Sequence, residues 1–416
     1  MKEWKEYKLA EVCENIYSGG TPSSMNASYW NGNLPWLSSG ETSQRYIYYT
    51  EKCITKEGAD NSSTRYAYKG STVIASAGQG HTRGQASMLC IDTYVNQSVL
   101  VLKPNPLIIN PHFLYFNLDG RYNELRQLSD GTSTRGSLSG KILKDLQIFL
   151  PSLNEQIKIA SILKSLDDKI EVNRRINENL EQQAQALFKS WFVDFEPFKD
   201  GEFVESELGM IPKGWRIVSL GDIMSYNGGS QPPASEFIDE YKEGYIRFIQ
   251  IRDYASEGHI TYIPISKRNK LCDVKDIMIA RYGASLGRIC YGLKGAYNVA
   301  LAKVTPIKDY YREYLRCFLN TREFYEGINN KGNRAVQAGF NQSDIQSFRI
   351  PYPVDEDILK RFEKLCSSYF EIRLLNDQLS RRIAELRDTL LPKLMSGEIK
   401  VLHTDLINEM LDKGIR

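Results

Sequence analysis

Two long heptad repeats constrain this chain more than any other feature of its sequence. Residues 159–191 carry core positions at alternating spacings of four and three, and residues 358–390 repeat them in phase, 199 positions later. A pattern held over 33 residues predicts a coiled-coil helix of roughly 50 Å in each copy. Two such helices should pack on each other, most economically antiparallel. The alternative is that each helix packs only on a globular domain of its own.

The start and the middle of these helices carry further signals. Ser152-x-x-Glu155 is a capping box that predicts the start of the first helix, and Pro197 lies beyond its end. Asn177 and Asn376 occupy matching core positions. Because a polar core residue costs stability but selects one alignment, we expect this pair to set the register of the two spacer helices.

The segments that precede the two helices also repeat each other. The matches are Trp4-(x4)-Leu9 with Trp215-(x4)-Leu220, Ser18–Thr21 with Asn227–Ser230, Val73–Gly78 with Met278–Gly283, Asn96 with Asn298, and Leu150-Pro151 with Ile350-Pro351. Their spacing falls steadily from 211 to 200 residues, as loop deletions in the second copy would produce. Five matches in the same order indicate an internal duplication.

Each copy begins with a mixed, β-rich region. Short apolar runs separated by Gly, Asn and Ser clusters predict strands at 71–77, 98–102, 147–150 and 276–280. Short helices are expected around 112–117 and 312–319.

The predicted fold class is α+β, with two pseudo-two-fold-related mixed α/β domains joined by two long antiparallel coiled-coil helices. The length of 416 residues agrees with several domains. The predicted segments are a first domain (1–151), a first spacer helix (152–192), a linker (193–208), a second domain (209–351), a second spacer helix (352–398) and a C-terminal tail (399–416).

The near-neutral charge of the chain conceals a separation of charge. With 53 basic and 51 acidic residues, a uniformly basic nucleic-acid coat is excluded. Residues 1–151 hold 15 basic and 13 acidic residues, and residues 209–351 hold 20 and 14, so the helices and linkers carry a net charge of −6. The basic globular regions favour phosphate binding, and the acidic helices favour protein partners.

The motifs of an enzyme are missing. Gly78-x-Gly80-x-x-x-Gly84 lacks dinucleotide-binding spacing, no Walker A motif or amino-methyltransferase tetrapeptide occurs, and Asp239-Glu240-x-Lys242 lacks a second carboxylate to share a metal. Seven scattered cysteines without C-x-x-C predict free thiols and no metal site. We therefore expect recognition and scaffolding rather than catalysis.

Nothing in the sequence indicates a membrane. No run of 18 apolar residues occurs, and the charged N-terminus lacks the apolar core of a signal peptide. We expect a cytoplasmic protein.

Three segments resemble the specificity (S) subunits of type I restriction–modification systems, and the resemblance covers essentially the whole length. The segments are 187–198 (LFKSWFVDFEPF) running into 206–215 (SELGMIPKGW), 390–399 (LLPKLMSGEI), and Leu150-Pro151-x-Leu153-x-Glu155-Gln156. The second copy departs from the last segment, because Ile350-Pro351 is not followed by a Glu-Gln pair. That departure weakens only the expected cap of the second helix.

The resemblance implies a DNA-reading subunit that catalyses nothing. Each globular region would be a target-recognition domain for one half of a split, asymmetric double-stranded DNA sequence, and the two helices would fix the gap between the halves. Two modification (M) subunits would bring S-adenosylmethionine and methylate adenine N6. Restriction (R) subunits would add an ATP- and Mg²⁺-dependent translocating nuclease. This chain itself would bind no cofactor and no metal.

Reading base edges requires Arg, Asn, Gln, Ser and Thr side chains on a surface, with further basic groups on phosphates. The favoured segments are Gly78–Arg83 and Thr132–Arg135 in the first domain and Arg281–Arg288 in the second. The candidate DNA-binding residues are Ser18, Thr21, Arg45, Tyr46, Gln79, His81, Thr82, Arg83, Thr132, Ser133, Thr134, Arg135, Arg281, Tyr282, Ser285, Arg288, Lys331, Asn333, Arg334 and Gln337. The alternative for each is a solvated loop residue, and Asn96 and Asn298 are interpreted as structural turn residues.

A second function remains open from the sequence. The chain could be a non-catalytic scaffold whose repeated domains bind protein or glycan around a coiled-coil tether. The charge separation and the central segment favour DNA.

Overall fold

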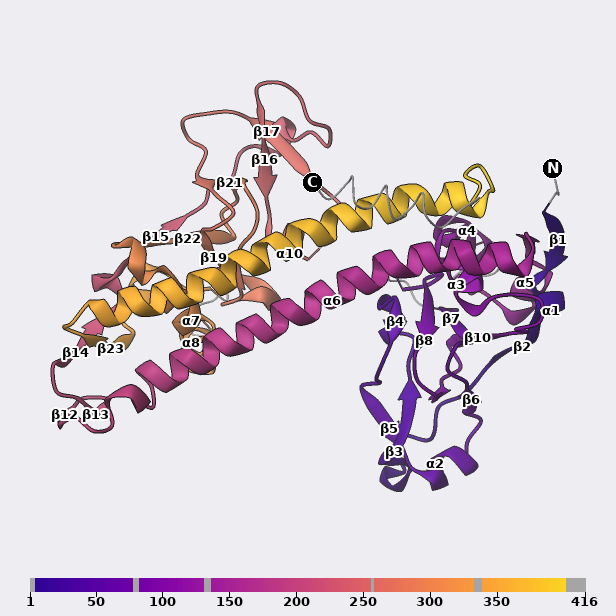
Figure 1. Ribbon diagram of the computed structural model, residues 1–416, viewed down its shortest axis with the longest axis horizontal. Helices are drawn as coiled ribbons and strands as arrows, with labels where there is room; N and C mark the ends of the chain where they lie inside the picture. Colours follow the sequence, from indigo (N-terminus) through magenta and orange to yellow (C-terminus); the bar gives the residue numbers. More distant parts are fainter. Residues whose placement is uncertain (1–3, 78–81, 131–135, 256–257, 333–338, 402–416) are drawn as a thin grey trace. The chain divides into compact units, whose positions relative to one another are not determined.

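The computed structural model describes residues 4–77, 82–130, 136–255, 258–332 and 339–401 (Figure 1). The chain divides into two compact units, one running up to Ile170 and including the residues from Arg382 onward, and one spanning Glu171–Arg381. Both predicted long helices are present, as α6 (Leu153–Phe192) and α10 (Asp357–Met395), and each runs through both units. The segment limits expected within the domains remain predictions.

The described residues of the first unit form three sheets. The five-stranded sheet has the order β2 (Cys13–Ser18), β10 (Val99–Pro104), β7 (Thr72–Ala75), β8 (Ala86–Leu89) and β4 (Tyr46–Ile47). The four-stranded sheet has the order β5 (Lys52–Ile54), β3 (Trp30–Leu37), β9 (Thr93–Val95) and β6 (Arg65–Ala67). The third sheet pairs β1 (Lys5–Lys8) with β11 (Gln147–Leu150). The short helices are α1 (Leu9–Val12), α2 (Lys56–Asp60), α3 (Pro111–Asp119), α4 (Tyr122–Asp130) and α5 (Gly140–Asp145).

The second unit repeats this strand order, although its first sheet has four described strands where that of the first unit has five. Its sheets have the orders β15 (Met224–Gly228), β22 (Leu301–Pro306), β19 (Ile277–Ala280), β20 (Ile289–Cys290), and β17 (Thr261–Pro264), β16 (Tyr245–Ile249), β21 (Gly295–Tyr297), β18 (Leu271–Cys272). Two further pairs are β14 (Trp215–Ser219) with β23 (Arg349–Pro353), and the hairpin β12 (Phe203–Ser206) with β13 (Gly209–Pro212). The short helices are α7 (Arg312–Leu319), α8 (Arg322–Gly332) and α9 (Gln342–Gln346).

The repetition extends to individual pairings. In each unit one strand pair of the second sheet is parallel, β3 with β9 and β16 with β21, within a sheet whose other pairs are antiparallel. The strands predicted from apolar runs correspond to β7, β10, β11 and β19, and the predicted short helices to α3 and α7. The runs form strands because their side chains are buried, and all four residues of β7 and of β19 are buried.

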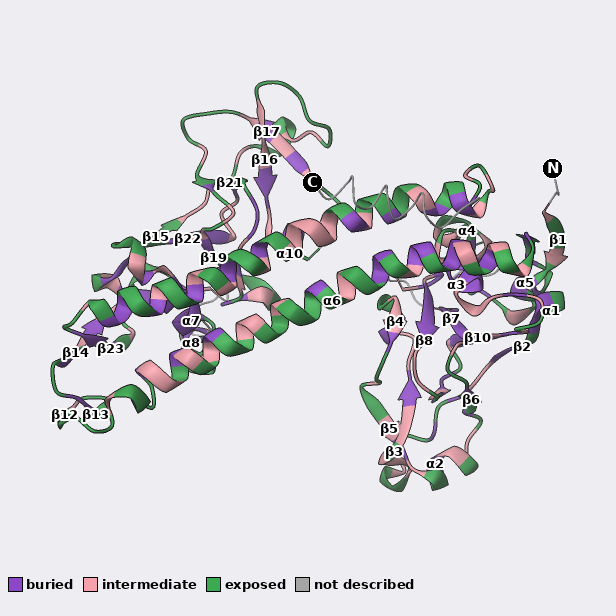
Figure 2. Cartoon of the chain, in the orientation of Figure 1, coloured by how far each residue is buried: buried purple, intermediate pink, exposed green. Residues whose placement is uncertain are grey.

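Each unit has its own large hydrophobic core, to which both long helices contribute. In the first, Leu163 of α6 and Leu394 of α10 join the buried face of α3. In the second, Phe192 of α6 packs against Tyr314 and Phe362, with ring centroids 4.8 and 5.0 Å apart. Figure 2 shows buried and exposed residues alternating along both helices, as amphipathic helices require.

The two helices contact each other within each unit, so the alternative of separate packing is wrong. In the first unit Arg387 pairs with Asp167 at 2.7 Å. In the second, Asn173 donates to Ser380 at 3.1 Å, and Asn376 donates to Asn177 at 2.9 Å. Partner numbers fall along α10 as they rise along α6, which is antiparallel pairing.

Both helices are fastened at their starts by corresponding residues. Gln156, which is buried, accepts from Asn110 N–H at 2.9 Å and donates to the carbonyl oxygen of Ile108 at 3.2 Å. Exactly 200 positions on, the Glu356 carboxylate accepts from Lys308 at 2.7 Å, and it also accepts from three tyrosine hydroxyls, those of Tyr310, Tyr311 and Tyr352. The sequence predicted a weak cap for the second helix. In its place, one lysine and three tyrosine hydroxyls donate hydrogen bonds to the single Glu356 carboxylate, a group that we call the Glu356 cluster.

Candidate nucleic-acid interface

One isolated β-bridge in each unit joins described residues at the borders of the segments on which the sequence placed the candidate residues. Ala77, just before the first segment, bridges to Ser137, just after the second. In the second unit Tyr282 bridges to Gly339 in the same antiparallel manner. The candidates Gln79, His81, Thr132, Ser133, Thr134, Arg135, Asn333, Arg334 and Gln337, and the side chain of Lys331, lie outside the described residues. The bridges bring the edges of the two predicted segments together in both domains.

Arg83 has a structural position. Its side chain is 7% exposed and forms an ion pair with Asp130. A Cβ atom on Gly136 would lie 1.6 Å from its Nη1 atom, so the guanidinium lies directly against the glycine backbone. Arg83 therefore links residues 130 and 136 and has little surface with which to contact DNA, whereas Thr82 is half-buried.

Arg45 and Tyr46 are also engaged within the protein. Arg45 lies 2.9 Å from the carboxylate of Asp119 and 3.4 Å from that of Asp167, and Tyr46 donates to Asp167 at 2.7 Å. Burial raises the pKa of Tyr46, and the neighbouring Asp167 raises it further. These contacts fasten β4 to helix α6. Arg45 and Tyr46 are therefore not included in the DNA interface that is proposed below.

Ser18 and Thr21 remain at the surface of the first domain. Ser18 is half-buried at the end of β2, opposite Leu100. Thr21 is exposed, and its hydroxyl donates to the Gln97 side chain at 2.5 Å.

Arg281 lies between two tyrosine rings in the second domain. Its guanidinium carbon is 5.9 Å from the ring centroid of Tyr226 and 5.0 Å from that of Tyr282, and its Nη1 donates to the carbonyl oxygen of Val299 at 3.3 Å. Burial raises the pKa of Tyr226, while the charge of Arg281 opposes that rise. Tyr282 is 39% exposed, so its ring covers Arg281 and still meets solvent.

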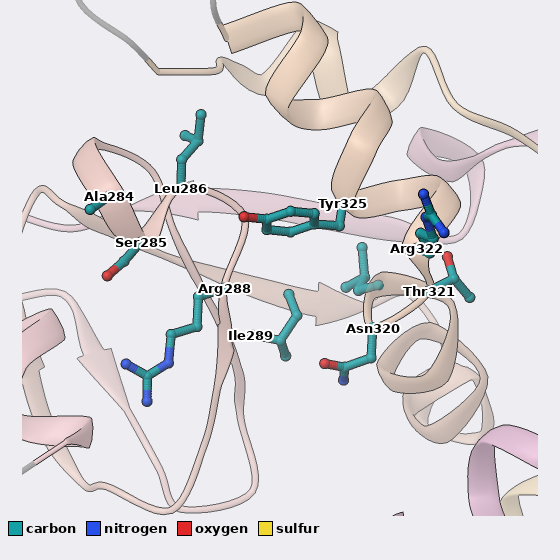
Figure 3. Close-up of a pocket in the computed structure, with 11 residues that line it drawn as sticks. Ala284, Ser285, Leu286, Arg288, Ile289, Asn320, Thr321, Arg322 and Tyr325 are labelled. Atoms are coloured by element: carbon teal, nitrogen blue, oxygen red, sulfur yellow. The ribbon is translucent and has the colours of Figure 1, made fainter. Parts of the chain in front are cut away.

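Ser285 and Arg288 line a pocket of about 690 Å³ with residues that the sequence did not single out (Figure 3). The lining residues are Ala284, Ser285, Leu286, Gly287, Arg288, Ile289, Leu319, Asn320, Thr321, Arg322 and Tyr325. Sequence reasoning missed the wall formed by Asn320, Thr321 and Arg322 because it lies more than 30 positions from Arg288 along the chain. The sequence signal that could have identified this wall is the polar run Asn320-Thr321-Arg322, at the junction of helices α7 and α8.

The pocket presents hydrogen-bond donors and no carboxylate. Arg288 is exposed and forms no ion pair with any of the described residues. Arg322 pairs with Glu326 at 2.6 Å, yet its side chain is 88% exposed. In Figure 3 the hydroxyl end of Tyr325 is directed toward the loop that carries Ser285 and Leu286. Such a lining suits an anionic or polar ligand.

Within the described residues, no group of three His, Cys, Asp or Glu side chains is placed to hold a metal ion. In the same part of the chain, no helix is both long and apolar enough to cross a bilayer.

Comparison with known proteins gives a consistent family. The model described as "Type I restriction modification DNA specificity domain" matches residues 1–182 and 212–376. The chain is 30% identical over 417 residues to the type I restriction enzyme MjaIX specificity subunit of Methanocaldococcus jannaschii, covering 96% of this chain and 94% of that protein. It is 25% identical over 472 residues to the HindI specificity subunit of Haemophilus influenzae, covering 96% and 100%.

The fold has a solved counterpart. The S subunit of the type I restriction–modification system from M. genitalium matches with a TM-score of 0.58 at 16% identity, covering 94% of this chain and 96% of that structure. This likeness concerns the fold alone.

Proposed function

Because the chain belongs to the type I restriction–modification DNA specificity family, we propose that its two domains each read one half of a split, asymmetric DNA target. The chain is a type I specificity subunit and not an enzyme. The observation that supports the proposal is the pair of equivalent bridges, Ala77–Ser137 and Tyr282–Gly339, which join described residues at the borders of the candidate segments in both domains.

The long helices supply the scaffold in this proposal. Their antiparallel contacts, including Asn177 with Asn376, hold one alignment and so one spacing between half-sites. Exposed apolar side chains occur on both helices, with Val172 and Ile176 on α6 and Ile372 and Leu375 on α10, and Ile176 and Leu375 stand 199 positions apart, at matching positions of the repeat. Such exposed apolar residues support docking of two M subunits, with R subunits joining the assembly. S-adenosylmethionine, ATP and Mg²⁺ belong to those partners.

The test measures DNA binding by the chain assembled with its M subunits. Site-specific affinity that falls steeply with salt is expected. Arg281→Ala should weaken or relax recognition of one half-site only, and equal loss at both halves would contradict the two-domain reading. Absence of any sequence preference would overturn the proposal in favour of a protein- or glycan-binding scaffold.

The spacing role has its own test. Deleting or inserting one heptad in α6 should change the accepted gap between half-sites and leave both half-site sequences unchanged, as read by sequencing of methylated adenines. An unaltered gap would count against the helices as a ruler.

A further inference from the structure

Backbone hydrogen bonds identify which residues of the two domains are equivalent around the pocket. Gly84 N–H donates to the carbonyl oxygen of Ala75, and Gly287 N–H donates to that of Ala280, both at 2.9 Å. The next residue repeats the correspondence, because Gln85 N–H donates to Thr82 and Arg288 N–H donates to Ser285, again at 2.9 Å in both. Arg288 therefore occupies the position of Gln85 in the first domain.

The same correspondence explains why Arg83 is not the counterpart of Arg288. Arg83 precedes Gly84 as Leu286 precedes Gly287. Both side chains are buried, Arg83 against Asp130 and Leu286 in the hydrophobic core of its unit. An internal ion pair in one domain thus corresponds to apolar packing in the other.

Among the described residues of the first domain, the cations at the position equivalent to the pocket have partners within the protein, and Arg126 there donates to the carbonyl oxygen of Arg83 at 3.4 Å. Gln85 is neutral and half-buried. Arg121, which stands 200 positions before Thr321, is held by Glu124 through two contacts of 2.6 and 2.7 Å, and it also donates to the carbonyl oxygen of Gln147 at 2.8 Å. Its charge is satisfied inside the domain.

In the second domain the corresponding positions do not hold such an ion pair. Residue 321 is a threonine and residue 324 a buried phenylalanine, where the first domain has Arg121 and Glu124, 200 positions earlier. Position 324 therefore supplies no carboxylate, the Glu326 carboxylate pairs with Arg322, and Arg288 supplies an exposed positive charge. Ser285, Asn320, Thr321 and Tyr325 add neutral donors around it.

We propose that this pocket holds a phosphodiester group of the DNA, with Arg288 as its principal cation, and that the first domain has no equivalent contact. The inference rests on the proposed DNA-reading function and deepens it. Guanidinium and hydroxyl donors without a carboxylate match a phosphate, and such contacts position the duplex without reading its sequence. The consequence is asymmetric, because the salt dependence of binding is contributed more by the second half-site than by the first.

The experiment measures the slope of log affinity against log salt concentration for the chain assembled with its M subunits. Arg288→Ala should lower affinity about tenfold, as expected for loss of a hydrogen bond to a charged group. It should also reduce the salt slope by about 0.9, the value of one phosphate contact. The base preference at every position of both half-sites should stay the same. Arg288→Lys should keep most of the slope, because an ammonium still pairs with a phosphate.

The control is Arg361→Ala, which removes the same charge from an exposed position on α10 and should leave the slope unchanged. Relaxed preference at one base pair in both Arg288 variants, with an unaltered slope, would assign Arg288 to base reading and overturn the proposal. An Arg288→Ala assembly that binds its site with unchanged affinity and slope would remove the pocket from the DNA interface. If instead the unmodified assembly shows no site-specific binding, the proposed function itself fails.

Discussion

Asn376 donates a hydrogen bond from Nδ2 to the Oδ1 atom of Asn177 at 2.9 Å, between matching positions of the two long helices. Asn177 in turn donates to Asp377 at 2.7 Å and to the carbonyl oxygen of Arg373 at 3.1 Å. The polar groups of Asn177 are thus satisfied only in this alignment of α6 with α10. A shift of either helix would leave them without partners in the core of the helix pair.

Replacing both members of this pair should cost less than the sum of the two single replacements. Asn177→Leu leaves Asn376 and Asp377 without their partner and should lower the free energy of unfolding by about 1–3 kcal/mol. In the double variant Asn177→Leu, Asn376→Leu, the two costs should fall short of additivity by about 0.5 kcal/mol or more, since residues in contact are coupled. Urea unfolding of the four chains measures the coupling, and additive costs would show that the pair is energetically independent.

The buried pair between Asp167 and Arg387 should be among the most sensitive contacts of the first unit. The two side chains are 3% and 10% exposed, and their atoms are 2.7 Å apart. Asp167→Asn removes the buried one of the two carboxylates that pair with Arg387, the other being the exposed Asp388, and should destabilise the unit by about 3–5 kcal/mol. The neighbouring Asp168→Asn is the matched control, because Asp168 is exposed and its one ion pair among the described residues is with Lys164 on the helix surface. Equal thermal stability of the two variants would contradict the structural role of Asp167.

The Glu356 cluster predicts a loss of stability in acid. Hydrogen bonds from Lys308, Tyr310 and Tyr352 hold the pKa of Glu356 down to about 2 from an ordinary value near 4.5. A lowered pKa means that the unfolded chain takes up the proton first, so this stabilisation is complete above pH 4.5 and is lost as pH falls toward 2. Glu356→Gln should lower stability at pH 7 and flatten its dependence between pH 4.5 and 3. Unfolding midpoints measured across this range check the prediction, and parallel pH profiles for the two chains would refute it.

Glu363 predicts the opposite dependence at higher pH. Burial raises its pKa to about 7, and its Oε2 accepts the backbone N–H of Glu313 at 2.8 Å. A carboxyl whose folded pKa is raised favours folding in its protonated form, so its contribution decreases as pH rises from 4.5 to 7, by at most about 1.4 kcal/mol per pH unit. Glu363→Gln should remove this decrease. The free energy of unfolding of the variant, compared with that of the unmodified chain at the same pH, should therefore be more favourable at pH 8 than at pH 5. The control is the exposed Glu371→Gln, which should keep the native slope.

The long helices and the repeat were predictable because they depend on local order in the chain. A heptad spacing is set by the geometry of a single helix, so 159–191 and 358–390 show it directly. The strands with continuous apolar runs, such as β7 and β19, were recognisable for the same reason. Of the candidate site, the sequence located the segments that Ala77 and Ser137 border, but it could not tell an available arginine from a buried one.

The availability of each arginine was decided by partners that are distant along the chain. Arg83 and Arg45 are basic residues in polar loops, as DNA-contacting residues often are. They nevertheless form ion pairs with Asp130 and Asp167, which lie 47 and 122 positions away along the chain. Arg288 keeps its charge free because no carboxylate among the described residues reaches it, and its pocket is completed by Asn320 and Thr321 from another segment. The sequence by itself therefore determined the duplication, the helices and the chemistry of the candidate segments. Only the tertiary structure decided which charges are neutralised internally, because ion pairing depends on distances in space that no local pattern encodes.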